Sequence, residues 1–187
     1  MSGLIYVFTG EGKGKTSAAL GVATRALLLD KKVGWVAFYK QDSWGLAEAK
    51  LKDRFTNVEM VFGGRGFHMD ERVKRVGVKG HVVVDTANEE EHREAARETI
   101  KKAKEELKSS KPCFLLVLDE VLNAVREGLV EEWEIMELLT MRGDTHIVLT
   151  GRGATEKIIE VADLVTECNK IKHPYDVGEL AIAGLDY

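Results

Sequence analysis

Short apolar runs alternate along this chain with longer segments whose apolar residues recur at helical spacing. The apolar or β-branched runs cover residues 4–9, 33–39, 58–62, 114–118 and 147–150. Between the first two runs, Leu20, Ala23 and Leu27 repeat at the period of an amphipathic helix, which we expect over residues 15–29. This alternation predicts an α/β fold of three layers, with helices on both faces of a mostly parallel central sheet. The length of 187 residues predicts a single domain over residues 1–187.

A further helix is predicted after Asn88, which together with Glu91 resembles a capping box. Glutamates fill residues 89–91 and lysines gather toward the end of the segment, an order that suits the helix dipole. The apolar stripe expected to face the core comprises Ala96, Ile100, Ala103 and Leu107. The charges of this segment therefore predict a solvated helix face without a functional site.

The segment 63–88 starts with Gly63-Gly64-Arg65-Gly66 and is expected to be a long irregular loop. Loops of this length inside a compact domain are commonly lids or binding loops. We therefore expect this segment to contact the substrate and to set specificity.

The charge balance excludes some classes of partner. The chain has 31 acidic and 27 basic residues and a net charge of −4, which predicts no binding to nucleic acid or to an anionic membrane. No apolar run approaches the length of a membrane span and no signal peptide precedes the first strand, so we expect a cytoplasmic protein. Cys113 and Cys168 stand far apart and the five histidines are scattered, which predicts reduced thiols and no transition-metal site.

The run Gly10-Glu11-Gly12-Lys13-Gly14-Lys15-Thr16 lies between the first strand and the first helix, where a triphosphate-binding loop (P-loop) is expected. Glycines let backbone amides turn toward an anion, the lysine adds a charge, and the threonine hydroxyl can ligate magnesium. The usual first glycine of GxxxxGK[ST] is replaced by Thr9. The predicted nucleotide-binding loop comprises Thr9, Gly10, Glu11, Gly12, Lys13, Gly14, Lys15, Thr16 and Ser17. The alternative is a glycine-rich turn without a ligand.

Other polar residues follow the predicted strands and should meet the loop at one edge of the sheet. Asp119 and Glu120 are expected to hold magnesium with Thr16, because a hard cation prefers oxygen ligands. Arg152, between two glycines, is expected to contact phosphate, and Lys40 follows the second strand. Alternatively, the two acids cap the next helix and both basic residues are solvated surface side chains.

These residues and several others carry a resemblance to a known family. The matching segments are Phe8-Thr9-Gly10-Glu11-Gly12-Lys13-Gly14-Lys15-Thr16, Ala23-Thr24-Arg25-Ala26, Leu118-Asp119-Glu120, Thr150-Gly151-Arg152-Gly153, Lys172-His173-Pro174-Tyr175-Asp176-Val177-Gly178 and Gly184-Leu185-Asp186-Tyr187. In this order they resemble the P-loop branch of the cob(I)alamin (corrinoid) adenosyltransferases over nearly the full length. That family has a RecA-like fold and carries the same shortened loop.

The resemblance implies a reaction in which a cobalt(I) corrinoid attacks the 5′-carbon of ATP and expels tripolyphosphate. ATP and the corrinoid are then substrates, and Mg²⁺ is the cofactor. Lys15 and Arg152 would stabilise the charge on the leaving group, so no general base is needed. The resemblance further implies that Arg25 contacts the nucleotide and that Glu120 is linked to magnesium. Glu11 stands where relatives often have Asn.

Relatives are understood to wedge apolar side chains into the lower face of the corrinoid so that cobalt(II) is more easily reduced. The matching residues are Phe67 and Met69, the latter where another aromatic is often found. Alternatively, both only anchor the loop to the core. Many relatives carry an N-terminal extension over the corrinoid, which we expect the long loop or a dimer partner to replace. The resemblance also implies a homodimer and an electron-donating reductase partner.

Two other functions remain open from the residues alone. A P-loop kinase or ATPase would use the same loop, with Glu120 positioning a water or hydroxyl, and would release ADP where the transferase releases tripolyphosphate. A non-catalytic carrier of corrinoid or ATP would bind both without turnover.

Overall fold

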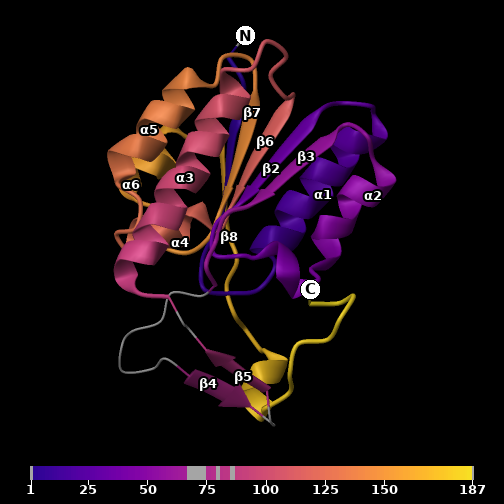
Figure 1. The fold of residues 1–187 in the computed structure, drawn as a ribbon, viewed down its shortest axis with the longest axis vertical. Helices are drawn as coiled ribbons and strands as arrows, with labels where there is room; N and C mark the ends of the chain where they lie inside the picture. The colour runs from indigo at the N-terminus through magenta and orange to yellow at the C-terminus, as the bar shows by residue number, and fades with distance from the viewer. Residues whose placement is uncertain (1, 67–74, 79–80, 85–86, 187) are drawn as a thin grey trace.

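Six parallel strands form the central sheet in the computed structural model, which describes residues 2–66, 75–78, 81–84 and 87–186 (Figure 1). In spatial order these strands are β3 (Val58–Phe62), β2 (Val33–Ala37), β6 (Leu115–Asp119), β7 (His146–Thr150), β1 (Ile5–Thr9) and β8 (Leu164–Glu167). The apolar runs that predicted strands therefore correspond to β1, β2, β3, β6 and β7. The edge strand β8 was not expected, because its residues are mostly exposed and lack a continuous apolar run.

The register of the strands brings their carboxyl ends to one level. Phe8 of β1 pairs with Thr150 of β7, and Ala37 of β2 pairs with Asp119 of β6. Because β7 also lies between β1 and β6, the segments that follow these four strands emerge at the same edge. This is the edge at which parallel α/β sheets bind ligands.

Helices cover both faces of the sheet, which confirms the predicted three-layer α/β architecture (Figure 1). One face carries α1 (Lys15–Leu28) and the short α2 (Leu51–Arg54), whose apolar side chains pack with one set of buried strand residues. The other face carries α3 (Glu89–Leu107), α4 (Val121–Arg126), α5 (Glu132–Met141) and α6 (Glu156–Val161).

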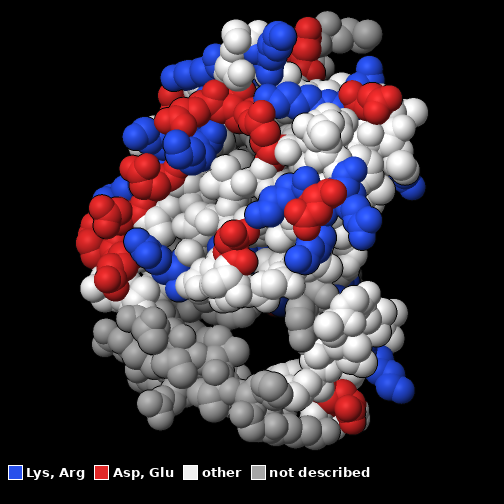
Figure 2. Space-filling view, turned by 45° about the vertical axis from the view of Figure 1, so that its right-hand side comes forward, with Lys and Arg blue, Asp and Glu red and all other residues white. Residues whose placement is uncertain are grey.

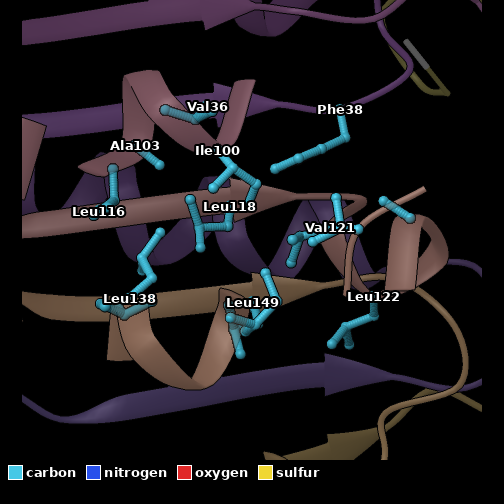
Figure 3. Close-up of a cluster of buried hydrophobic side chains, with 14 of the residues drawn as sticks. Val36, Phe38, Ile100, Ala103, Leu116, Leu118, Val121, Leu122, Leu138 and Leu149 are labelled. Carbon is cyan, nitrogen blue, oxygen red and sulfur yellow. The ribbon is translucent and has the colours of Figure 1, made fainter. Parts of the chain in front are cut away.

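The two cores follow from the alternation of side chains along each strand. Val7 packs into the core beneath α3 to α6, and its neighbour Phe8 packs into the core beneath α1. Figure 3 shows the first of these cores, where Leu118 and Leu149 of the sheet meet Ile100 and Leu138 of the helices. Strands buried on both faces explain why β6 reads as an unbroken apolar run.

The predicted helices are confirmed in their main features. Ala23 and Leu27 of α1 are buried against the sheet, with Leu20 partly buried beside them. Asn88 and Glu91 form the capping box of α3, since each side chain accepts a hydrogen bond from the other residue's backbone amide. The predicted stripe of α3 is buried as well: Ala96, Ile100, Ala103 and Leu107.

The prediction of an irregular segment over residues 63–88 is wrong in part. Within it, β4 (Arg75–Val78) and β5 (His81–Val84) pair as antiparallel strands. The physical reason is visible in the sequence, where β-branched valines stand on both sides of the short Lys79-Gly80 link. The hairpin forms its own two-stranded sheet, separate from the central one.

Charges of both signs are intermixed over the face of the molecule drawn in Figure 2. Both cysteines are free, as predicted, with Cys113 buried in the core. Within the described ranges, none of the helices combines the length and the apolar character needed to cross a membrane.

The core assignment predicts that two leucines contribute very differently to the free energy of unfolding. Leu138 of α5 is 0% exposed and Leu28 of α1 is 68% exposed. Leu138→Ala should lower the free energy of unfolding by about 2–5 kcal/mol, because it removes buried methyl groups and leaves a cavity. Leu28→Ala should change it by less than about 0.5 kcal/mol. Urea denaturation followed by circular dichroism measures both, and equal losses would contradict the core assignment.

Candidate functional site

A cavity of about 1160 Å³ lies at the carboxyl edge of the sheet, between the P-loop, the end of β2 and the C-terminal tail, residues 168–186. It brings together most of the residues that the sequence singled out. The predicted site residues that line it are Glu11, Gly12, Lys13, Gly14, Lys15, Thr16, Ser17, Lys40, Glu120 and Arg152. Thr9 and Gly10, at the start of the loop, are not part of this lining.

The glycines of the loop allow a neighbouring backbone segment to lie directly against it. The amide of Gly12 donates to the carbonyl of Cys168 at 2.6 Å, and the amide of Cys168 donates to the carbonyl of Thr9 at 2.8 Å. A Cβ on Gly12 would lie only 2.7 Å from the Cys168 carbonyl oxygen, so a larger residue would push the two segments apart. Gly14 begins α1 with a φ of 118°, a conformation that favours glycine.

Lys15 is held inside the loop. Its Nζ donates to the carbonyl oxygens of Gly10 at 2.8 Å and Gly12 at 2.6 Å, and the residue is buried. Burial, followed by the charge of Arg152, lowers the pKa of Lys15, while Glu120 and Glu11 offset part of this effect. The ammonium is therefore placed where it can exchange carbonyl contacts for a phosphate.

Asp119 is the most buried charge of the site, at 0% exposure. Its Oδ1 accepts from the Thr16 hydroxyl at 3.0 Å and from the Thr150 hydroxyl at 2.8 Å. Its Oδ2 lies 2.7 Å from Nζ of Lys40, which also pairs with buried Glu48 at 2.7 Å. Burial alone would lower the pKa of Lys40, but the charges of Asp119 and Glu48 raise it above its ordinary value.

Glu120 follows in a left-handed backbone conformation, with φ of 63° and ψ of 14°, that is uncommon for a residue with a side chain. Its carboxylate accepts from the Asn123 side-chain amide, and its side chain makes no capping bond to α4. Burial, followed by the charge of Asp119, raises the pKa of Glu120, and Lys40, Lys15 and Arg152 offset only part of this. Neither acid therefore serves merely to cap the next helix.

Arg152 meets the loop through Glu11. The Nε of Arg152 lies 2.9 Å from one oxygen of the Glu11 carboxylate, and Nη1 of Arg126 lies 3.3 Å from the other. The backbone amide of Arg152 donates to the Asn123 side chain at 2.6 Å. The Glu11 carboxylate can therefore compete with phosphate for this guanidinium.

The C-terminal tail forms part of the wall of the cavity. His173, Tyr175 and Asp176, from a segment that carries the family resemblance, line the cavity. Asp186 pairs with Lys13 of the P-loop, and Asp176 pairs with Lys170 at 2.8 Å. The tail is thus tied across the mouth of the loop by charge.

Arg25 does not lie with the other predicted nucleotide contacts in this chain. It is exposed in the third turn of α1, and it lines a separate cavity of about 270 Å³ with residues such as Phe114 and His146. The reason is geometric: α1 runs away from the loop, so ten residues beyond Lys15 correspond to about 15 Å along the helix. Arg25 therefore does not line this cavity, and its contact with nucleotide stays a prediction of the resemblance.

Two predicted wedge residues, Phe67 and Met69, lie outside the described residues. Conversely, the sequence did not predict several residues that contact the site residues, among them Glu48, Asn123, Arg126 and Thr150. Asn123 follows Glu120 by three positions at the start of α4, so helical spacing could have indicated it. Arg126 pairs with Glu11, which is distant in the sequence. No sequence pattern indicated Glu48, because only the fold brings its carboxylate to Nζ of Lys40.

The donor set at the loop fits magnesium in its chemistry. The Thr16 hydroxyl and a fully buried carboxylate lie in direct contact, and Glu120 lines the adjoining cavity. Magnesium is usually held by one or two carboxylates together with substrate phosphates and water. Among the residues that the structure describes, no cluster of three or more His, Cys, Asp or Glu forms an all-protein metal cage.

The raised pKa of Glu120 predicts how stability depends on pH. The folded protein holds this proton to a higher pH than the unfolded chain, so the carboxyl destabilises the fold increasingly as pH rises through the raised pKa. Glu120→Gln should therefore raise the melting temperature at pH 8, and the gain should disappear near pH 4. For a chain of this size each kcal/mol corresponds to about 2–4 °C.

The exposed Glu94→Gln on α3 is the matched control and should leave the melting temperature unchanged at both pH values. A lower melting temperature for Glu120→Gln at pH 8 would show that the carboxylate is stabilised by its cationic neighbours, contrary to this interpretation.

Comparison with known proteins identifies the family of the chain. The family model for ATP:corrinoid adenosyltransferase BtuR/CobO/CobP matches residues 1–187. The chain is 37% identical over 186 residues to a corrinoid adenosyltransferase of Escherichia coli (strain K12), covering 99% of this chain and 86% of that protein. It is 34% identical over 187 residues to corrinoid adenosyltransferase CobA of Salmonella typhimurium, with the same coverage, and 31% identical over 186 residues to a corrinoid adenosyltransferase of Pseudomonas aeruginosa, covering 99% and 84%. The chain therefore belongs to the ATP:corrinoid adenosyltransferase family.

Proposed function

We propose that the cavity at the carboxyl edge carries out adenosyl transfer from ATP to a cobalt(I) corrinoid, with release of tripolyphosphate. The observation that carries this proposal is a cavity of about 1160 Å³ with the P-loop in its wall. Pockets for one small ligand usually measure about 300–1,000 Å³, so this volume suits a nucleotide together with part of a second substrate.

The reaction is a displacement at carbon. An electron pair of cobalt(I) forms the bond to the 5′-carbon, the bond between that carbon and its oxygen breaks, and this electron pair leaves on the triphosphate. Charge therefore develops on the leaving group, and no proton has to be removed. Preorganised cations and backbone amides are the groups that stabilise such charge.

The residues of the loop are assigned accordingly. Backbone amides of the loop, other than that of Gly12, which donates to Cys168, hold the triphosphate. Lys15 exchanges its contacts with loop carbonyls for a phosphate oxygen. Arg152 is assigned to stabilise the charge on the leaving triphosphate. It lies at the rim of the cavity, where its side chain is 37% exposed. Lys40 pairs with Asp119 and fixes it beneath the loop through their 2.7 Å contact.

Mg²⁺ is assigned to Thr16 and Asp119, with Glu120 beside them, on the chemistry of this donor set. When bound, the ion would neutralise part of the charge on the triphosphate. The Thr16 hydroxyl already contacts Asp119 at 3.0 Å, so the two oxygens are held together by the protein itself.

The remaining assignments rest on the family resemblance. We assign residues 63–88 to substrate binding, with Phe67 and Met69 against the lower face of the corrinoid. The whole chain is then one P-loop domain, acting in the cytoplasm as a homodimer that receives cobalt(II) corrinoid reduced by an electron-donating partner. Adenosyl transfer is favoured over phosphoryl transfer because the relatives named above are corrinoid adenosyltransferases.

The assignment of Lys15 predicts a large loss of activity. Lys15→Ala should reduce formation of the cobalt–carbon product at least about 10²-fold, the scale seen when one charge-stabilising donor is removed. The measurement is an anaerobic assay with ATP, magnesium and chemically reduced cobalt(I) corrinoid, followed by the spectrum of the product. Lys101→Ala, on the exposed face of α3, is the control and should keep full activity. Near-normal turnover of Lys15→Ala would refute the role.

The wedge assignment predicts a different pattern. Phe67→Ala should impair adenosylation strongly when the corrinoid is supplied as cobalt(II) with a reductant, because the lower axial ligand would no longer be displaced. The same variant should be nearly normal with cobalt(I) prepared beforehand. Equal losses in the two assays would contradict a wedge and indicate a general packing role.

A further inference from the structure

Glu11 places a carboxylate on the loop to which we assign the negatively charged triphosphate. Its Oε1 lies 3.3 Å from Nη1 of Arg126, and its Oε2 lies 2.9 Å from Nε of Arg152. The two oxygens of one carboxylate thus hold two guanidinium groups that come from α4 and from the segment after β7. The Glu11 carboxylate thus binds Arg152 in the way that a phosphate oxygen of ATP would.

The two arginines differ in what they can reach. Arg152 lines the cavity, whereas Arg126 does not. The stem of Arg126 lies against Gly153, where an added Cβ would come within 2.9 Å of Cδ of the arginine. Glycine at this position therefore lets Arg126 lie along the outside of the loop, close to Glu11 but beside the cavity.

This arrangement poses an electrostatic problem for nucleotide binding. A carboxylate near the triphosphate repels it, and the same carboxylate competes with it for Arg152. A second cation on Glu11 reduces both effects, because the carboxylate keeps a partner when Arg152 moves away. Such exposed contacts are individually weak, so they can exchange without a large barrier.

We propose that Glu11 and Arg126 are positioning residues that control the release of Arg152 to the polyphosphate. Before ATP binds, Glu11 holds both arginines. When ATP binds, Arg152 exchanges the carboxylate for phosphate, and Glu11 stays paired with Arg126. The inference rests on the proposed function only in taking ATP as the ligand, and no covalent step is involved.

The test is a set of double-mutant cycles in which the dissociation constant of Mg·ATP is measured by calorimetry on the full chain. Glu11→Gln should tighten binding about threefold, the scale of an exposed ion pair, and Arg126→Ala should weaken it about threefold. In the Glu11→Gln background, Arg126→Ala should have little effect, because no carboxylate remains to be held. In the Arg152→Ala background, Glu11→Gln should bring a smaller gain, because only the repulsion of the phosphates is then relieved.

Two results would overturn the proposal. If Arg126→Ala weakens binding equally with and without Glu11, Arg126 acts on the nucleotide directly. If Glu11→Gln tightens binding equally with and without Arg152, Glu11 only repels the phosphates. The gain from Glu11→Gln should also shrink between about 50 and 500 mM salt, since salt screens exposed charges.

A control variant and a measurement of folding complete the test, and the choice of assay separates this inference from the proposed function. Glu137→Gln removes an ion pair with Lys104 far along α3 and should leave the dissociation constant unchanged. Melting temperatures confirm that each variant folds. Because binding is measured without corrinoid, a chain that showed the coupling but formed no cobalt–carbon product would refute adenosyl transfer and leave the inference intact.

Discussion

The buried carboxylate of Asp119 is the constraint on which the site depends. A charge with no exposed surface must be paired and hydrogen-bonded, since removing one partner from such a group typically costs about 3–5 kcal/mol. The partners here are Thr16 at the start of α1, Thr150 at the end of β7 and Lys40 after β2. One side chain thus fixes the relative positions of the segments that follow four neighbouring strands.

The site has a fixed inner layer of buried charges and an outer layer of charges at its rim, and the fixed layer allows the rim to rearrange. Asp119 and Lys40 are buried and fixed, whereas Glu11, Arg126 and Arg152 are partly exposed and joined by contacts that are easily exchanged. Phosphate binding then requires rearrangement only at the rim, where Lys15 and Arg152 give up protein oxygens for ligand oxygens. The strained backbone of Glu120 lies between the two layers, at the point where β6 turns into α4.

Much of this could be predicted from the sequence, because it depends on local patterns. Apolar runs indicated the strands, the glycine-rich run indicated the P-loop, and the polar residues after the strands indicated which edge binds. The errors arose where the outcome depends on tertiary geometry. The pairing of Glu11 with Arg126, for example, was not predicted, because it joins residues far apart in the sequence. The hairpin of β4 and β5 was missed although its valine runs were visible.

The central claim is that this cavity presents the 5′-carbon of ATP, rather than a phosphorus atom, to the attacking metal. The most direct measurement uses ATP labelled with ¹⁸O at the oxygen that bridges the 5′-carbon and the α-phosphorus, with mass analysis of the products after incubation with a cobalt(I) corrinoid. The account predicts that the label leaves entirely in tripolyphosphate, because the carbon–oxygen bond breaks. Label retained in ADP or AMP would show cleavage at phosphorus and would contradict it.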